Sequence, residues 1–298
     1  MCTGEAAQRA RYAISVRIRL DISYDGTHFR GWAKQPAHRT VQGTLEAALA
    51  RIVGSEVQFV VAGRTDAGVH ATGQVAHVDL TDEQWSRVQT RQGKSVVDAG
   101  ASIAHRMRGV LGAYPDATVV RSSVAPEGFD ARFSAVWRRY EYRLADDVSG
   151  YRPLQRHGTT SVRGELNAEA MDAAAQGLIG LHDFAAYCKA REEATTIRTL
   201  LDYRWRRDDE GVLIAHVKAD AFCHSMVRAL VGACVAVGEG RLDGTDLISL
   251  RDALDRTSAF KVLAARGLTL AEVGYPDASL LGQRAEQTRA RRDLPAAG

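Results

Sequence analysis

The sequence predicts an α+β fold, because segments typical of antiparallel strands are mixed with segments typical of helices. In the strand-like segments every second residue is apolar, whereas the helical segments repeat apolar residues at three- and four-residue spacing. Two stretches with this outline lie on either side of an alternating segment at 137–146. We therefore expect two similar halves, residues 17–150 and 151–278, although a likeness of pattern is too weak to establish a duplication.

The first half opens with the segment IRLDISYD at 18–25, whose apolar residues share one face and predict a strand. Apolar residues at helical spacing predict a helix at 41–53, and Thr40 suits its N-cap. Further strands are expected at 57–63 and 74–80.

The rest of the first half is harder to interpret. We expect a helix around 102–111 and a strand at 117–125, with a loop at 89–100. The central segment WRRYEYRLAD at 137–146 alternates in the manner of a strand.

The second half repeats the mixture of helices and strands. A helix is expected near 166–179, strands at 199–208 and 212–222, and a second helix at about 224–237.

The charge of the chain is unevenly placed. The net charge is +3, with +3 in residues 1–20 and +2 from Gln283 onward, so the remainder carries −2. Charge of this size does not by itself indicate a nucleic-acid partner. Residues 1–16 and 279–298 are polar, rich in Ala and Arg and unpatterned, so we expect both to be disordered tails, the first basic and the second Arg-rich.

Composition also bears on location. No apolar run approaches the roughly 18 residues that span a bilayer, and the N-terminus lacks the apolar core of a secretory signal. The four cysteines, Cys2, Cys188, Cys223 and Cys234, lie far apart without a Cys-x-x-Cys pair. We expect reduced thiols in a cytoplasmic protein that does not enter a membrane, without disulfides or a zinc site.

The segment GRTDAG at 63–68 is the first candidate functional motif. Gly63 and Gly68 allow a tight turn with positive φ, which would expose the residues between them. Asp66 then fits an ordinary turn aspartate as well as a functional one. A phosphate loop is not expected, because no Gly-Lys-[Ser/Thr] follows the glycines. His70, His77 and Asp79 could bind a metal but lack a recognised ligand spacing. His77 would simply be solvated on the outer face of a strand.

Arg228 is the second candidate, because the helix around it is apolar almost all round and is therefore expected to be buried on several sides. A buried arginine needs a carboxylate partner, since an unpaired buried charge is very costly. The alternative is an arginine whose long side chain reaches solvent near the helix end.

The third candidate is the segment GFDARFSAVWRRYEYRL at 128–144, in which arginines alternate with aromatic residues. Aromatic rings that stack on bases and arginines that bind phosphates suit single-stranded or looped RNA. Alternatively, Tyr140, Tyr142 and Leu144 share one strand face and could be ordinary core. The residues concerned are Arg132, Arg138, Arg139, Arg143, Phe129, Phe133, Trp137, Tyr140 and Tyr142.

These segments resemble a known family. AGRTDAGVHATGQVAHVD resembles the signature of the tRNA pseudouridine synthase A family, and YDGTHFRGWAKQ, FDARFSAVWRRYEYRL, ADAFCHSMVRALVGACVAVGEG and ARGLTLAEVGYP are similar to its other motifs in the same order. The resemblance runs from about 18 to 277. Departures include CHS near Cys223, Ala229 in place of a usual asparagine, and no arginine soon after the aromatic residues of DFAAYCKAREEA.

The resemblance implies roles for individual residues. Asp66 corresponds to the catalytic aspartate, and Arg64 to the arginine that replaces a flipped base in the RNA stack. Tyr140 corresponds to the tyrosine that stacks on the target uracil, Arg228 to the arginine paired with the catalytic carboxylate, and Leu268 to an apolar contact in the pocket. A tRNA-contacting strip corresponds to Phe129, Asp130, Ala131, Arg132 and Phe133.

The resemblance also implies a fold and an activity. We expect the pseudouridine synthase fold, with two ferredoxin-like halves that share a mixed, mainly antiparallel sheet with flanking helices and a central cleft. The implied reaction isomerises uridine to pseudouridine in the anticodon stem-loop of tRNA, at positions 38, 39 and 40, in a homodimer bridged by tRNA. It requires no metal and no organic cofactor, and Asp66 must be ionised whether it attacks the ribose or forms a glycal.

Two other functions fit parts of the pattern. A non-catalytic RNA-binding protein would keep the fold and the basic and aromatic segment but would not need a buried ion pair at Asp66. A metal-dependent hydrolase would use His70, His77 and Asp79 and would need a metal for turnover.

Overall fold

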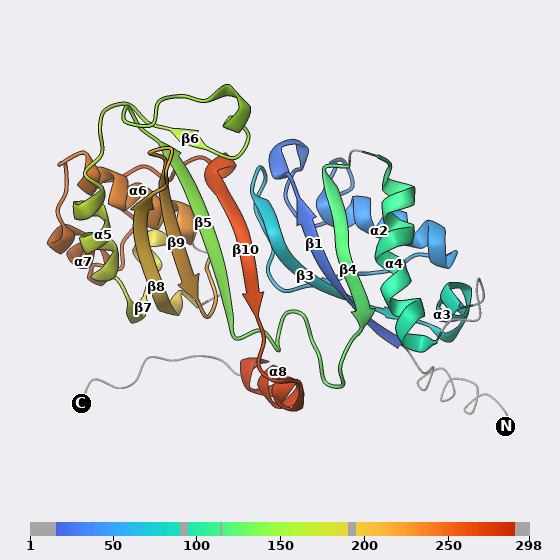
Figure 1. Ribbon diagram of the computed structural model, residues 1–298. Helices are drawn as coiled ribbons and strands as arrows, with labels where there is room; N and C mark the ends of the chain where they lie inside the picture. The colour runs from blue at the N-terminus through green and yellow to red at the C-terminus, as the bar shows by residue number, and fades with distance from the viewer. Residues whose placement is uncertain (1–15, 90–94, 114, 190–194, 290–298) are drawn as a thin grey trace.

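The protein is built on one mixed sheet, seen in a computed structural model that describes residues 16–89, 95–113, 115–189 and 195–289 (Figure 1). The main path of the sheet runs β4-β1-β3-β10-β5-β9-β8-β7, with β2 paired to β3 and β6 paired to β5. Most neighbouring strands are antiparallel; β10 pairs in parallel with β3, and β6 with β5. The expected α+β class with a mixed, mainly antiparallel sheet is confirmed.

The first half places β1 between β3 and β4, with helices packed against these strands (Figure 1). The inward positions of β1 are fully buried, as its alternation predicts, and the Thr40 side chain caps the helix that follows by accepting a hydrogen bond from the Gly43 N–H. The elements are β1 (Val16–Tyr24), η1 (Gly26–His28), α2 (Val41–Val53), β2 (Val60–Val61), β3 (His70–Leu80), α3 (Asp82–Gln89), α4 (Val96–Leu111) and β4 (Ala117–Val124).

The second half contains the remaining strands and helices. Every residue of its helix α6 except Arg228 is buried, which confirms the prediction from an apolar pattern on all sides. The elements are β5 (Trp137–Ala145), η2 (Pro153–Gln155), β6 (Thr160–Ser161), α5 (Ala168–Gln176), β7 (Gly180–Asp183), η3 (Ala185–Tyr187), β8 (Ile197–Arg207), β9 (Leu213–Ala219), α6 (Met226–Gly238), α7 (Gly244–Asp252), η4 (Ala265–Gly267), β10 (Leu268–Gly274), η5 (Ala278–Leu280) and α8 (Leu281–Arg289).

The last strand, β10, joins the two halves at the centre of the sheet. It pairs in parallel with β3 at Thr269 and His70, and antiparallel with β5 from Leu268 to Gly274. β5, which we expected within the first half, is paired with β9 and β10, so the sheet has no break at residue 150. The strand that follows the GRTDAG motif therefore lies beside the last strand of the chain.

A buried ion pair holds the outer part of the second half together. The Asp146 carboxylate accepts hydrogen bonds from both terminal nitrogens of Arg207, at 3.0 and 2.6 Å, and from the Leu166 N–H at 3.0 Å. Asp146 follows β5 and Arg207 ends β8, so the pair ties two strands to the segment before α5. Burial alone would raise the pKa of Asp146, but its hydrogen bonds with Arg207, Leu166 and Ser149 outweigh burial and lower it.

The predicted C-terminal tail is wrong for residues 279–289. They complete η5 and form α8, and Leu281 and Ala285 of this helix are buried. In Figure 1 this helix lies beyond the lower end of the sheet. Only two apolar side chains anchor the helix, so its apolar pattern was too weak to recognise. Residues 1–15 and 290–298 of the predicted tails lie outside the described residues.

Two other local predictions need correction. α4 begins at Val96, so most of the expected loop at 89–100 that the structure describes is helical. The expected strand at 57–63 is reduced to the two residues of β2, because only these pair with β3. Within the described residues, no helix is long and apolar enough to cross a membrane.

The expectation of reduced thiols is wrong for two cysteines. A disulfide joins Cys188, at the end of η3, to Cys223, shortly before α6, with their Cα atoms 5.8 Å apart. The two residues are 35 positions apart in sequence, and a backbone hydrogen bond from the Lys189 N–H to the His224 carbonyl helps to bring them together. Cys234 is a free, buried thiol.

Candidate active site

The GRTDAG motif forms a turn between β2 and β3, and its backbone packs closely on Gly31, a glycine outside the motif. Gly68 has the expected positive φ, at +78°, whereas Gly63 does not. Gly31 has a φ of +88°, and a Cβ there would lie 2.9 Å from the Thr65 carbonyl oxygen. The Trp32 N–H donates to the same carbonyl at 3.0 Å. The turn therefore needs glycine at position 31 as well as within the motif.

Thr65 anchors the turn from inside. Its hydroxyl is hydrogen-bonded to the Tyr24 hydroxyl at 2.7 Å, and Gln74 Nε2 donates to Tyr24 at 3.3 Å and to the Gly63 carbonyl at 2.8 Å. Burial raises the pKa of Tyr24 to about 12, so its hydroxyl stays neutral at ordinary pH. With Thr65 buried, its neighbour Arg64 is exposed, and Asp66 keeps 37% of its side chain exposed.

The basic group beside Asp66 is a histidine that the sequence did not predict. His224 Nε2 lies 3.4 Å from Asp66 Oδ1. Arg228, the expected partner of this carboxylate, instead donates to Ser225 Oγ at 3.3 Å. Within the part of the chain that the structure describes, no ion pair joins Arg228 to Asp66, so the expected pairing stays a prediction. Ser225 has a φ of +66°, and this bend precedes α6, where Arg228 lies in the first turn.

Tyr140 lies in β5 near the same turn. Its side chain is buried and packs edge-on against Phe222, with ring centroids 5.1 Å apart. Burial raises the pKa of Tyr140, the charges of Tyr24 and Asp66 raise it further, and Arg138 opposes them. Tyr140 is therefore a neutral core residue close to Asp66, and its contact with a base stays a prediction.

Leu268 is the first residue of β10, the strand that pairs with β5. It is buried, faces Tyr142 across the β10–β5 pair and directly follows η4. η4 approaches the motif, because a Cβ at Gly68 would lie 3.3 Å from Ala265 Cβ and His70 Nε2 is 3.1 Å from the Arg266 carbonyl oxygen. The structure thus brings the motif, β5, the segment before α6 and the start of β10 to one place.

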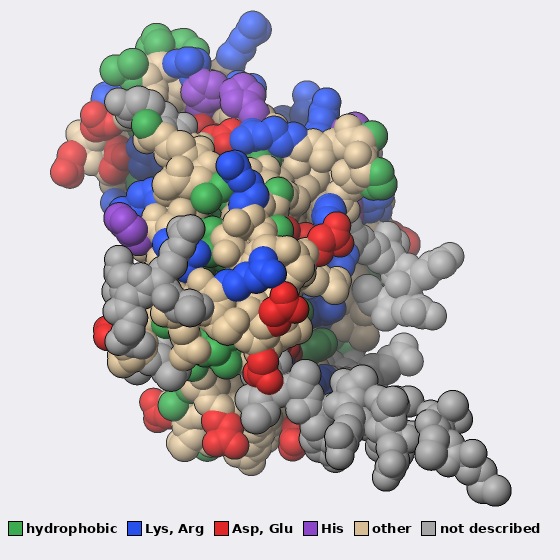
Figure 2. Space-filling view, turned by 90° about the vertical axis from the view of Figure 1, so that its right-hand side faces the viewer, with side chains coloured by type: hydrophobic (Ala, Val, Ile, Leu, Met, Phe, Trp, Pro, Cys, Tyr) green, Lys and Arg blue, Asp and Glu red, His purple; other side chains and the backbone are tan. Residues whose placement is uncertain are grey.

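An open hollow of about 470 Å³ lies at the outer side of the turn. It is lined by Thr27, His28, Phe29, Arg30, Ala67 and Gly68. Figure 2 views the molecule from the right-hand side of Figure 1, and Lys, Arg and His side chains gather in the upper part of that face. The hollow therefore lies against the end of the motif that follows Asp66, and His28 and Arg30 are its basic lining residues.

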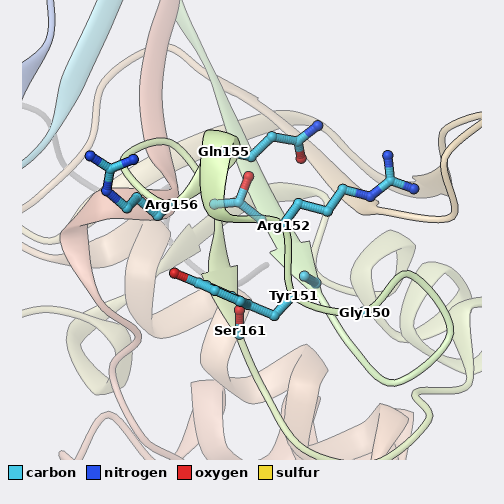
Figure 3. A pocket seen from close by; sticks show the side chains of 8 residues that line it. Gly150, Tyr151, Arg152, Gln155, Arg156 and Ser161 are labelled. Carbon is cyan, nitrogen blue, oxygen red and sulfur yellow. The ribbon is translucent and has the colours of Figure 1, made fainter.

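A second, smaller hollow lies in the loop before β6 and is lined by none of the predicted site residues. Figure 3 shows Arg152 and Arg156 of this loop extending in opposite directions from it. The loop reaches the first half of the chain, because the rings of His157 and His28 lie 6.3 Å apart.

The predicted RNA-contacting strip is only partly on the surface. Phe129 and Ala131 are buried, and Phe129 packs against His77 and Tyr275, so RNA contact through these two side chains is contradicted. Asp130 accepts hydrogen bonds from the backbone N–H groups of Arg132 and Phe133, at 2.9 Å each, and acts as a turn residue.

Two residues of the strip remain accessible. Arg132 is exposed and Phe133 is partly buried. The Arg132 guanidinium lies 5.0 Å from the centre of the Phe133 ring, and Arg289 of α8 lies 4.9 Å from the same ring. Phe133 is therefore a partly exposed aromatic ring with two cations beside it, of the kind that can stack on a base.

The three residues considered for a metal site have other partners. His77 is buried, contrary to the expectation of a solvated residue, and its Nδ1 accepts from the Ala131 N–H at 3.0 Å. His70 Nδ1 accepts from the Gly26 N–H, and Asp79 pairs with Arg17 at 2.7 Å. The part of the chain that the structure describes contains no cluster of three His, Cys, Asp or Glu residues able to hold a metal ion.

Comparison with known proteins identifies the class. A sequence profile described as tRNA pseudouridine synthase matches residues 22–100 and 174–276. This match covers more than half of the chain and includes the motif, Asp66, His224 and β10. The chain is thus placed among the pseudouridine synthases, and the expected fold is confirmed.

Curated relatives make the assignment more specific. A Leifsonia xyli protein named tRNA pseudouridine synthase A is 62% identical over 284 residues, or 94% of this chain and 99% of the relative. Proteins of the same name from Streptomyces griseus and Frankia casuarinae are 49% and 51% identical, covering 95% and 94% of this chain and 96% and 97% of their own lengths. The chain belongs to the tRNA pseudouridine synthase A family, isomerases that act on uridine in tRNA.

The likeness to solved structures is much weaker. A chain of an H/ACA ribonucleoprotein bound to a substrate RNA has a TM-score of 0.33 and 11% identity, covering 74% of this chain and 44% of that one. The assignment rests on the sequence relatives.

Proposed function

We propose that this enzyme isomerises uridine to pseudouridine in the anticodon stem-loop of tRNA, at positions 38, 39 and 40, with Asp66 as the catalytic residue. The observation that carries the proposal is the turn itself. It buries Thr65 against Tyr24 and leaves the Asp66 carboxylate partly exposed, 3.4 Å from His224 Nε2. An aspartate that served only the turn would not need this combination of rigid backbone and accessible carboxylate.

The reaction breaks the C1′–N1 bond of uridine and forms a C1′–C5 bond, while the C5 proton leaves and N1 gains a proton. Asp66 either attacks C1′ of the ribose or removes a ribose proton to form a glycal, and both routes need the ionised carboxylate. His224 Nε2 lies 3.4 Å from this carboxylate and forms an ion pair with it when the imidazole is protonated. Neither route calls for a metal or an organic cofactor.

The target base must leave its stack, which costs a few kcal/mol. In the proposal the exposed Arg64 enters the stack in its place, and the uracil packs against the Tyr140 ring, with Leu268 on the neighbouring strand. Tyr140 is 8% exposed, so only a small part of this side chain is open to a base. Arg132 and Phe133 would contact the adjoining RNA.

The family resemblance extends the proposal to assembly and location. We propose a cytoplasmic homodimer that binds one tRNA across both subunits. Light scattering of the free protein measures the assembly, and a monomer that remains fully active would contradict it.

The catalytic role of Asp66 is tested with tRNA tritiated at uridine C5. Wild type should release tritium and Asp66→Asn should not, because the amide can neither attack C1′ nor accept a proton. Asp209→Asn is the matched control, since Asp209 is exposed in the turn between β8 and β9. Release by Asp66→Asn at the wild-type rate would refute the catalytic role.

The same assay separates the rival functions. Tight binding of tRNA without release by wild type would indicate a non-catalytic RNA-binding protein. Loss of release on adding EDTA, with recovery on adding zinc, would indicate a metal-dependent reaction. Mapping the modified nucleotides then tests the anticodon stem-loop, and modification confined to another arm of tRNA would contradict that part of the proposal.

A further inference from the structure

Arg138 contacts three separate segments around the candidate active site. Its pattern suggested a phosphate-binding arginine, but the structure buries it in β5, with 9% of its surface exposed. Its Nη1 donates to the Asp220 carbonyl at 2.8 Å, and its Nη2 donates to the carbonyls of Ala62 and Arg132 at 2.8 and 2.9 Å. All three acceptors are main-chain oxygens.

The three carbonyls belong to the segments that build the site. Ala62 directly precedes the GRTDAG turn that carries Asp66, and Arg132 lies in the partly exposed strip with Phe133. Asp220 begins the segment 220–225, which carries Phe222 against Tyr140 and His224 against Asp66. One guanidinium therefore links the main chains of all three segments.

Arginine suits this position because its planar fork presents several N–H donors in fixed directions. A lysine ammonium is a compact group on a flexible stem and does not reproduce that fork. The Ala62 carbonyl belongs to a residue that is only 3% exposed, so losing its donor would leave a buried acceptor unsatisfied. The turn would then be free to shift relative to β5.

We propose that Arg138 is a positioning residue for the pseudouridylation reaction: it sets the spacing of the Asp66 turn, the His224 segment and the Arg132 strip through their backbones. The inference rests on the proposed catalytic role of Asp66. Arg138 touches neither uracil nor phosphate in this role. A misplacement of about 1 Å at a reacting group can lower a rate by about 100-fold, so small shifts of these segments are enough.

The test compares Arg138→Lys with Arg204→Lys in the tritium-release assay. Arg204 lies in β8, is exposed and pairs with Asp202. Arg138→Lys should lower kcat by about 10- to 100-fold and leave KM for tRNA within about threefold, since the RNA-facing side chains are kept. Arg204→Lys should change neither constant by more than about twofold. Thermal unfolding of each variant gives its folded fraction at the assay temperature.

A second variant covers the case in which Arg138→Lys does not fold. Arg138→Ala, purified and assayed with added guanidinium ion in the low millimolar range, should regain part of its kcat, because the ion fits the space that the side chain vacates. Sodium chloride at the same concentration is the control, since tRNA binding weakens with salt. Recovery by guanidinium but not by sodium supports the role.

Several results would overturn the inference. An unchanged kcat in Arg138→Lys would do so, as would a loss of kcat no larger than the loss of folded protein. A raised KM with unchanged kcat would show instead that Arg138 binds RNA directly. If wild type is active and Asp66→Asn is not, these results count against Arg138 alone. An inactive wild type would remove the proposed function and this inference with it.

Discussion

At the scale of single residues, the site depends on side chains that support the motif from beneath. Thr65 lies between the two residues expected to act, and its hydroxyl is held by Tyr24. Gly31 allows the backbone of the turn to pack against it. Neither contact involves an atom expected to touch the substrate. The exposed motif therefore depends on a buried scaffold of ordinary residues.

Gly31→Ala should disturb this scaffold. The new Cβ would lie 2.9 Å from the Thr65 carbonyl oxygen, at a φ of +88° that disfavours any side chain. We expect a loss of about 1–3 kcal/mol in the free energy of unfolding and at least a tenfold fall in kcat. Urea unfolding and tritium release measure the two effects.

Gly109→Ala is the matched control for this change. Gly109 lies within α4, and a Cβ there meets nothing within 4 Å. It should raise stability by about 0.5–1 kcal/mol, because alanine favours a helix over glycine, and leave kcat unchanged. Equal effects of the two substitutions would contradict the role of Gly31.

At the scale of elements, α8 supports the strip that carries Arg132 and Phe133. The Ser134 hydroxyl donates to the Leu281 carbonyl at 3.0 Å, and a Cβ at Gly128 would lie 2.8 Å from the Gly282 nitrogen. Arg289 at its other end lies over Phe133. The helix is therefore a structural part of the molecule that also contributes a cation to the partly exposed strip.

Leu281→Ala tests whether α8 packs against the rest of the protein through its buried apolar side chain. Leu281 is 3% exposed, so its truncation should cost about 2–4 kcal/mol of unfolding free energy in a urea titration. The adjacent Leu280 is 47% exposed, and Leu280→Ala should change stability by less than about 0.5 kcal/mol. Similar values for both variants would mean that α8 does not pack as described.

At the scale of the whole molecule, one continuous sheet contains the strands of both halves. β10 lies between β3 and β5, so the strand after the motif and the strand with Tyr140 are separated by a single strand. The buried Asp146–Arg207 pair fastens β8 to the end of β5 farther out. The pair therefore joins two strands of the second half, one of which, β5, carries Tyr140.

The Asp146–Arg207 pair predicts a pH dependence. The pKa of Asp146 is lowered in the folded protein, so its contribution is fully present above the unfolded pKa of about 3.9 and is lost as pH falls through the folded value. Asp146→Asn should cost about 1–3 kcal/mol at pH 7, because Arg207, whose side chain is 24% exposed, would lose its charged partner.

Unfolding of wild type and Asp146→Asn by urea between pH 7 and pH 3 measures this contribution. The difference between the two proteins should be largest at neutral pH and shrink below about pH 4. A difference that stays constant over this range would show that the charge of Asp146 contributes nothing to stability.

The predictions from sequence were most accurate where the determining contacts are local. The helix at 41–53 has the predicted bounds, because its cap and its apolar spacing involve residues within a few positions of each other. The apolar character of the helix around Arg228 likewise predicted its burial. Arg64 and Asp66 were recognisable for the same reason, since they belong to one short motif in the chain.

The partners of these residues could not be predicted in the same way. Phe129 looks like an RNA-stacking residue in sequence but packs in the core, because an exposed and a buried aromatic carry the same local pattern. His224 was not predicted to lie beside Asp66, because this contact joins residues far apart in the chain and has no local pattern.

The sequence by itself determined the family, the main helices and strands, and the motif that presents Asp66. Only the tertiary structure decided that β10 enters the centre of the sheet and that His224 lies beside Asp66. It also decided that Arg138 donates to the main chain of three separate segments. The physical reason is the range of the interactions. Periodicity and caps depend on neighbours in the chain. Strand order and buried hydrogen bonds depend on contacts between distant residues such as His70 and Arg266, which are 196 positions apart.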